Sequence, residues 1–248
     1  MTDKISPITL LGQESIMVNK VEDIRFVDQR ALTLAVDIAF LLEESERTKD
    51  AWHGSAFARC AITNAALMLE CVANSCLGSL SLPSRLLEEL DRLPPLSKFD
   101  YYLFSRTSKH IDRGCCEAQL ASDVLKLRDH IVHPKMKPGS IVGEGESQYV
   151  DYGATKVLGI ALDNREWSHS EGMKVAEVAT NFLRRFFLEW CGHEKGSATR
   201  ILVCRERDLL NHDSAMWVQM PRAEYGLVQK WLPAILSYMD LRPSGSDA

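Results

Sequence analysis

Hydrophobic residues in this chain recur mainly every three or four positions, which is the period of an amphipathic helix. One such stripe begins after Phe26 and ends in the charged run 43–50. The pattern over about 51–79 is apolar nearly all round in its second half, as expected for a helix at the centre of a bundle. Further helical stripes cover about 115–133 and 170–192. The pattern therefore predicts four long helices packed on one another.

Shorter elements are expected between these helices. Residues 84–93 predict a short helix that two prolines end, and the aromatic-rich stretch 99–110 predicts another. A glycine-rich loop follows the third long helix and contains a possible short strand at about 149–152. The first residues, 1–25, have no helical period and are expected to be extended. We assign 26–195 to one mainly α, up-and-down bundle with short insertions.

The character of the chain changes after the fourth long helix. Residues 200–204 and 216–220 resemble short strands and predict a hairpin. A final helix is expected over 222–240. These elements predict a small C-terminal α/β appendage over 196–241, followed by a disordered tail at 242–248.

Composition limits the classes of function. The chain has 248 residues, 46% of them hydrophobic and 25% charged, which is usual for a soluble globular protein. Its net charge of −5 excludes nucleic-acid binding through an overall basic surface. The neighbourhood 106–137 is locally basic, with seven Lys and Arg against four Asp and Glu. The start of the chain does not resemble a signal peptide. Glu70 interrupts the most membrane-like stretch, 60–80, so we expect a buried helix and a cytoplasmic protein without a membrane span.

The cysteines give no clear metal site. There are seven, most of them in apolar runs and none in a CxxC pair, which indicates free thiols in a reducing compartment. A zinc site using Cys115, Cys116 and His110 is the functional alternative, but a structural zinc site needs a second half that the sequence does not supply. We therefore expect no metal and no cofactor.

The stretch KLRDHIVHPK, residues 126–135, carries the strongest chemical signal. Arg128 follows Val124 by four residues, so it borders the buried stripe of its helix. On an ideal helix Arg128 and His133 are about 140° apart, since each residue turns about 100°. They converge only if His133 leaves the helix, and the proline at 134 favours that departure.

The segment R-D-H-I-V-H, residues 128–133, resembles the Arg-x4-His signature of the HEPN superfamily, and AALMLECVAN resembles an earlier helix of that family with Glu70 at the matching place. The resemblance covers roughly 27–192. It implies a HEPN-like bundle, and in many members a metal-independent ribonuclease of toxin or defence type that acts as a homodimer on RNA, with an antitoxin partner. By this resemblance Arg128 would hold the scissile phosphate, His133 would be the general acid–base group and Asp129 would orient or polarise one of them. Flanking residues expected to bind RNA are Lys126, His130 and Lys135.

A structural interpretation of the same residues remains open. Glu70 lies midway along an apolar helix, and a buried carboxylate needs a partner. If Arg128 forms an ion pair with Glu70, the motif marks the fold, and the protein is a non-catalytic HEPN-like binding or assembly module, with a nucleotidyltransferase-like or other defence partner. The direction in which Arg128 points distinguishes the two hypotheses.

Overall fold

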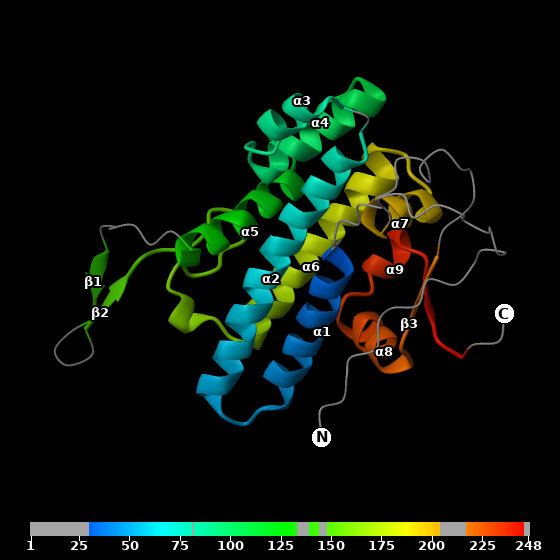
Figure 1. Ribbon diagram of the computed structural model, residues 1–248. Helices are drawn as coiled ribbons and strands as arrows, with labels where there is room; N and C mark the ends of the chain where they lie inside the picture. The colour runs from blue at the N-terminus through cyan, green and yellow to red at the C-terminus, as the bar shows by residue number, and fades with distance from the viewer. Residues whose placement is uncertain (1–29, 81, 133–138, 144–147, 204–216, 246–248) are drawn as a thin grey trace.

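The computed structural model describes residues 30–80, 82–132, 139–143, 148–203 and 217–245. The predicted mainly helical character is confirmed (Figure 1). The helices are α1 (Ala31–Arg47), α2 (Ala51–Gly78), α3 (Ser84–Leu90), α4 (Pro95–Thr107), α5 (Cys116–Val132), the 3-10 helix η2 (Asn164–Glu166), α6 (His169–Arg184), the π-helical turn η3 (Arg185–Trp190), α7 (Lys195–Val203), α8 (Arg222–Trp231) and α9 (Ile235–Tyr238). The strands are β1 (Ser140–Val142), β2 (Tyr149–Asp151), β3 (Val218–Met220) and β4 (Leu241–Pro243).

Helix α2 is the central element, and α1, α4, α5 and α6 pack around it (Figure 1). Its first turn is capped by Asp50, whose side chain accepts the backbone N–H of His53 at 2.8 Å. Two polar residues inside this apolar helix, Glu70 and Asn74, have partners on neighbouring helices. Asn74 Oδ1, for example, accepts a hydrogen bond at 2.6 Å from Nζ of Lys98, a lysine that is 3% exposed on α4. Buried polar groups paired in this way fix the position of one helix against another.

Helix α2 is also long and apolar enough to cross a membrane. The most apolar 18-residue window of the helix is 61% buried by the rest of the protein. The core helix of a globular bundle has the same length and composition, so this resemblance to a membrane span is weak.

Helix α6 has a well-defined start and an irregular end. Ser168 and Glu171 form a capping box. The Ser168 side chain accepts the backbone N–H of Glu171, and the Glu171 carboxylate accepts the backbone N–H of Ser168 at 2.9 Å. At its C-terminal end the helix continues into the π-helical turn η3, where the Cys191 N–H donates to the Phe186 carbonyl at 2.9 Å. Gly192 then adopts a φ of +65°, which glycine accommodates without strain, and the chain turns away.

The short strand predicted near residue 149 is confirmed as β2, and it has a partner that the sequence pattern did not indicate. β1 and β2 pair antiparallel, with Ser140 opposite Asp151 and Val142 opposite Tyr149. All six strand residues are exposed. The hairpin extends away from the bundle beyond the end of α5 (Figure 1).

The predicted C-terminal hairpin is wrong. Residues 201–203, expected in a strand, lie in helix α7. Ala198, Ile201 and Leu202 are buried at the three- and four-residue spacing of a helix face, so packing against the bundle overrides the β-branched composition. The second predicted strand exists as β3, but it pairs in parallel with β4, placing Val218 opposite Leu241.

The predicted helix over 222–240 and the predicted tail also differ from the structure. The helix is divided into α8 and α9, because Leu232 precedes Pro233 and leaves the helical conformation. Residues 241–243, expected partly in a disordered tail, form β4 instead. The Arg222 side chain donates to the carbonyls of Ser244 and Gly245 and holds this end of the described chain in place.

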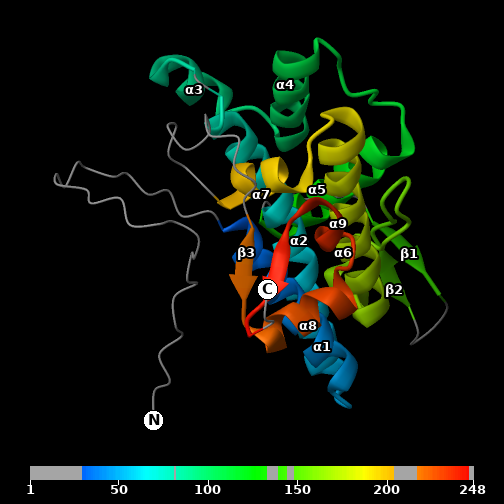
Figure 2. The same cartoon turned by 90° about the vertical axis from the view of Figure 1, so that its right-hand side faces the viewer.

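The residues after 195 do not form a separate appendage. Figure 2 shows α8 and α9 against the side of the bundle formed by α1 and α6, and β4 packs on α8. Their buried side chains belong to the same hydrophobic cluster as those of the four long helices. Trp231 Nε1 donates to Glu43 of α1 at 2.9 Å and Lys230 Nζ binds the same carboxylate at 2.7 Å. The extended segment predicted for 1–25 lies outside the described residues.

Candidate functional site

The candidate site lies on the last two turns of α5. The helix forms because Ala118, Ala121, Val124 and Leu127 recur at helical spacing, and all four are buried against α2 and α6. Arg128 follows this buried stripe and lies at its edge, as its position in the sequence predicted. The direction of α5 is therefore fixed by core packing, and the core places Arg128 beside α2.

The guanidinium of Arg128 contacts two carboxylates. It forms an ion pair with Glu70 of α2, and its Nη1 lies 2.7 Å from Oδ1 of Asp129. The side chains of Arg128 and Glu70 are 21% and 31% exposed, so the pair is partly withdrawn from water. This partial burial acts to lower the pKa of Arg128, but the hydrogen bond that Arg128 donates to Asp129 and the charges of both carboxylates outweigh it and raise the pKa.

Not all of the predicted site residues come together. The structure joins Arg128, Asp129 and Glu70. His130 is half-buried on the same helix. His133 and Lys135 lie outside the described residues, so the expected approach of His133 to Arg128 remains a prediction.

Lys126 is directed elsewhere on α5. Its Nζ binds Oδ1 of Asp123 at 2.9 Å. The step from Lys126 to Arg128 is about 200° around the helix, so the two cations occupy opposite sides of α5.

The charges around Arg128 restrict its chemistry. One guanidinium is held by two carboxylates, which leaves the trio with a net charge of −1. A phosphate approaching Arg128 would have to displace a carboxylate that already occupies the guanidinium. In this arrangement Arg128 joins α2 to α5 and is poorly placed to receive a phosphate.

Asp123, the most buried carboxylate on α5, was not among the predicted site residues. It is 1% exposed, and its two oxygens accept hydrogen bonds from Lys126, from the Val157 N–H at 2.7 Å and from the Leu158 N–H at 3.1 Å. Burial acts to raise the pKa of Asp123, but these three donors outweigh it and lower the pKa. The sequence signal that could have indicated this role is an aspartate on the apolar face of a predicted helix. The Asp123 carboxylate binds the segment after β2 to α5.

A second buried titratable group, His193, was not among the predicted site residues. Only 9% of His193 is exposed, and its Nε2 lies 2.9 Å from the hydroxyl of Tyr102 on α4. Burial, together with the charge of Arg106, lowers the pKa of His193 to about 4. The neighbouring Cys191 thiol has its pKa raised to about 12, mainly by burial. Both groups are therefore neutral at physiological pH.

The residues considered for zinc do not gather. His110 Nδ1 lies 3.1 Å from Asp100 Oδ2, while Cys116 is exposed at the start of α5. Within the described ranges no three His, Cys, Asp or Glu side chains are grouped so that they could hold a metal ion.

Comparisons of the chain with protein-family models, with curated proteins and with solved structures give no match. The geometry of the site and the residues that surround it are therefore the basis for assigning a function.

Proposed function

We propose that this protein is a HEPN-like binding or assembly module in which Arg128 has a structural role. The observation that carries the proposal is the contact of the Arg128 guanidinium with Glu70 and Asp129. The order of the long helices α1, α2, α5 and α6, with the arginine at the end of the third, supports the resemblance to HEPN proteins. A nucleotidyltransferase-like or other defence protein is the partner class that the resemblance implies.

The electrostatics of the trio favour this function over catalysis. A guanidinium that stabilises a phosphate in a transition state has to face the substrate with its donors available. Here Nη1 and Nη2 of Arg128 are both directed at carboxylates. Removing Arg128 would leave Glu70 without its partner on a partly buried helix face, so the arginine contributes to the packing of α2 against α5.

A metal-independent endoribonuclease that acts as a homodimer is the second candidate. One observation favours it: Arg128 lies in the last turns of α5, only a few residues before His133, and keeps a fifth of its side chain exposed. In that function Arg128 and His133 would act on the RNA phosphate and ribose hydroxyl, with Asp129 orienting them. Lys126, His130 and Lys135 would bind the strand.

An RNA-cleavage assay separates the two candidates. Purified protein is incubated with a mixed single-stranded RNA pool in EDTA, beside His133→Ala, Arg128→Ala and Glu70→Gln variants of verified helical content. We expect wild type and His133→Ala to leave the RNA equally intact, and both Arg128→Ala and Glu70→Gln to melt at lower temperature. Because Glu70→Gln removes one of the two negative charges that hold the guanidinium, a ribonuclease would instead keep or gain activity in that variant.

Cleavage by the wild type that disappears in a folded His133→Ala variant would overturn the structural assignment. The EDTA inactivates contaminating metal-dependent nucleases by chelating their metal ions. A preparation carrying His133→Ala through the same purification controls for contaminating metal-independent ones.

A further inference from the structure

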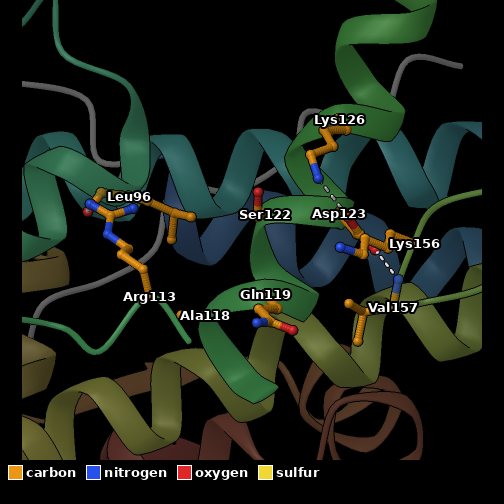
Figure 3. A pocket seen from close by; sticks show the side chains of 9 residues that line it. All are labelled: Leu96, Arg113, Ala118, Gln119, Ser122, Asp123, Lys126, Lys156 and Val157. Carbon is orange, nitrogen blue, oxygen red and sulfur yellow. Dashed lines mark hydrogen bonds and ion pairs between the residues drawn. The ribbon is translucent and has the colours of Figure 1, made fainter. Parts of the chain in front are cut away.

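A hollow lies beside α5, on the side away from Arg128. Its volume is about 260 Å³. The polar side chains that line it come from the loop before α5, from α5 itself and from the segment after β2, and they are Arg113, Gln119, Ser122, Asp123, Lys126 and Lys156 (Figure 3). Three stretches of chain therefore bring three cations to one hollow.

The hollow has an excess of positive charge. Arg113, Lys126 and Lys156 face a single carboxylate, that of Asp123. Both oxygens of Asp123 are already occupied, one by Lys126 and the other by the N–H groups of Val157 and Leu158. Within the part of the chain that the structure describes, neither Arg113 nor Lys156 forms an ion pair with a carboxylate. A surplus of two positive charges thus remains for a ligand.

The walls that carry these cations are held in place. Arg113 Nη2 donates to the Leu96 carbonyl at 2.9 Å, which fixes the guanidinium at one end of the hollow. Lys156 directly precedes Val157, whose backbone is bound to the buried Asp123 at 2.7 Å. Preorganised donors bind an anion more tightly because less conformational entropy is lost on binding.

The arrangement of donors suits an extended anion. In Figure 3 Arg113 lies at one end of the hollow and Lys126 and Lys156 lie at the other, with Gln119 and Ser122 between them. Arginine offers a fork of N–H donors to a phosphate, lysine offers a point charge, and the amide and hydroxyl add neutral donors. The volume lies just below the usual range of small-molecule sites, about 300–1,000 Å³, which suits phosphoryl groups with an adjoining sugar better than a large cofactor.

We propose that this hollow binds a phosphate ester, with phosphoryl oxygens at the Lys126–Lys156 end and a second negative group at Arg113. Free nucleotides and single-stranded RNA share this chemistry. The proposal does not rest on the function proposed above, because Arg113 and Lys156 belong to neither the ion pair of Glu70 nor the R-x4-H motif.

Binding to three probes tests the proposal. Titration calorimetry measures inorganic phosphate and a nucleoside 5′-diphosphate, and fluorescence anisotropy measures a labelled six-nucleotide single-stranded RNA, all at low ionic strength. The variants are Lys156→Glu and Arg113→Gln, with Lys49→Glu as control. Lys49 is exposed in the loop between α1 and α2, so its substitution changes the net charge as Lys156→Glu does but leaves the hollow intact.

We expect Lys156→Glu to weaken binding of the diphosphate about tenfold or more and Arg113→Gln to weaken it about fivefold, each without loss of thermal stability. Lys49→Glu should change it less than about twofold, and binding should weaken as salt is raised. Tighter binding of RNA than of the diphosphate would identify the natural source as a strand, and the reverse would identify a free nucleotide. Either result supports the hollow as a phosphate site.

No binding by wild type at millimolar probe would overturn the proposal, as would equal effects of Lys156→Glu and Lys49→Glu. Because Lys156 is exposed and Lys156→Ala removes only its side chain, that variant is a second test should the charge reversal disturb folding. The RNA-cleavage assay with His133→Ala is a separate measurement from phosphate binding. Failure of the phosphate site can therefore be told apart from failure of the proposed function.

Discussion

Arg128 illustrates how one side chain supports two hypotheses. Its contact with Glu70 predicts a measurable coupling between the residues. We expect Arg128→Ala and Glu70→Ala each to lower the free energy of unfolding by about 1–2 kcal/mol, with a coupling energy of about 1 kcal/mol because the pair is partly exposed. Urea denaturation of both single variants and the double variant measures it.

The exposed pair Arg85–Glu89 on α3 is a suitable control for this cycle. Its side chains are 92% and 63% exposed, and Nε of Arg85 lies 3.6 Å from Oε1 of Glu89, so we expect no measurable coupling. Equal coupling in the two pairs would show that the α2–α5 contact contributes no more than an ordinary surface contact.

His193 predicts a dependence of stability on pH. In the folded protein its pKa is lowered to about 4, whereas the unfolded imidazole binds a proton near pH 6.5. Between these values the unfolded state binds more protons, so stability is fully present above pH 6.5 and falls as the pH is lowered towards 4. The loss between pH 7 and pH 5 should be about 2 kcal/mol.

The matched variant is His193→Gln, which retains a polar partner for Tyr102 but does not titrate. Urea denaturation at pH 7, 6 and 5 should show a smaller decline in this variant than in the wild type. Parallel declines would indicate that His193 has the same pKa in the folded and unfolded states and that another group causes the pH dependence.

Some of these side-chain contacts could be predicted from the sequence, and others could not. The meeting of Arg128 with Glu70 could be anticipated because each residue interrupts or borders an apolar helix face. The burial of His193 could not, because it depends on the π-helical turn before it, and on the close packing of α4, neither of which has a periodic signature. The hollow beside Asp123 combines residues from three segments, and no local pattern indicates such a meeting.

Within the helices, two glycines differ in the space around them, so we expect their substitution by alanine to have opposite effects on stability. A Cβ at Gly172 of α6 would lie 3.1 Å from Cδ2 of Leu42 and 3.6 Å from Cα of Ala58, and Leu42 is fully buried. A Cβ at Gly226 of α8 would meet nothing within 4 Å. The close approach of α6 to α1 and α2 therefore depends on glycine at 172, whereas position 226 has room for alanine.

We expect Gly226→Ala to raise the free energy of unfolding by about 0.5–1 kcal/mol, because alanine restricts the unfolded chain and favours the helix. Gly172→Ala gains the same helical preference but crowds a packed core, which costs about 1–3 kcal/mol, so its net effect should be destabilising. Thermal and urea denaturation of the two variants checks the sign of each change. Stabilisation by both would mean that Leu42 moves aside at little cost.

Elements with a long helical stripe were predicted correctly, and the errors lie in short apolar segments. Residues 201–203 are β-branched and aliphatic, a composition found in strands and in buried helices alike. Their helical form is set by the surfaces of α2 and α9 that cover them. β4 escaped prediction because a three-residue strand ending in proline has almost no local signal, and it exists through its pairing with β3.

At the scale of the whole molecule, the elements after residue 217 complete the core. Val228, Leu232 and Ile235 are each at most 1% exposed and belong to the cluster that α1 and α6 form. A chain ending at residue 216 should therefore lose cooperative unfolding or become insoluble, since it would expose the apolar faces of α1 and α6. A chain ending at Gly245 is the control and should unfold like the full-length protein. Circular dichroism during urea denaturation compares them.

The contact between α1 and α8 also has a consequence for synthesis on the ribosome. Glu43 on α1 finds its partner Lys230 only 187 residues later. At a translation rate of roughly 5–20 residues per second, Lys230 is synthesised roughly 10–40 s after Glu43. During this interval the apolar surface of α1 that α8 covers in the finished fold is accessible to chaperones, and a slowly translated message would prolong that exposure. The dependence of this protein on chaperones should therefore follow translation speed more closely than the stability of the finished fold.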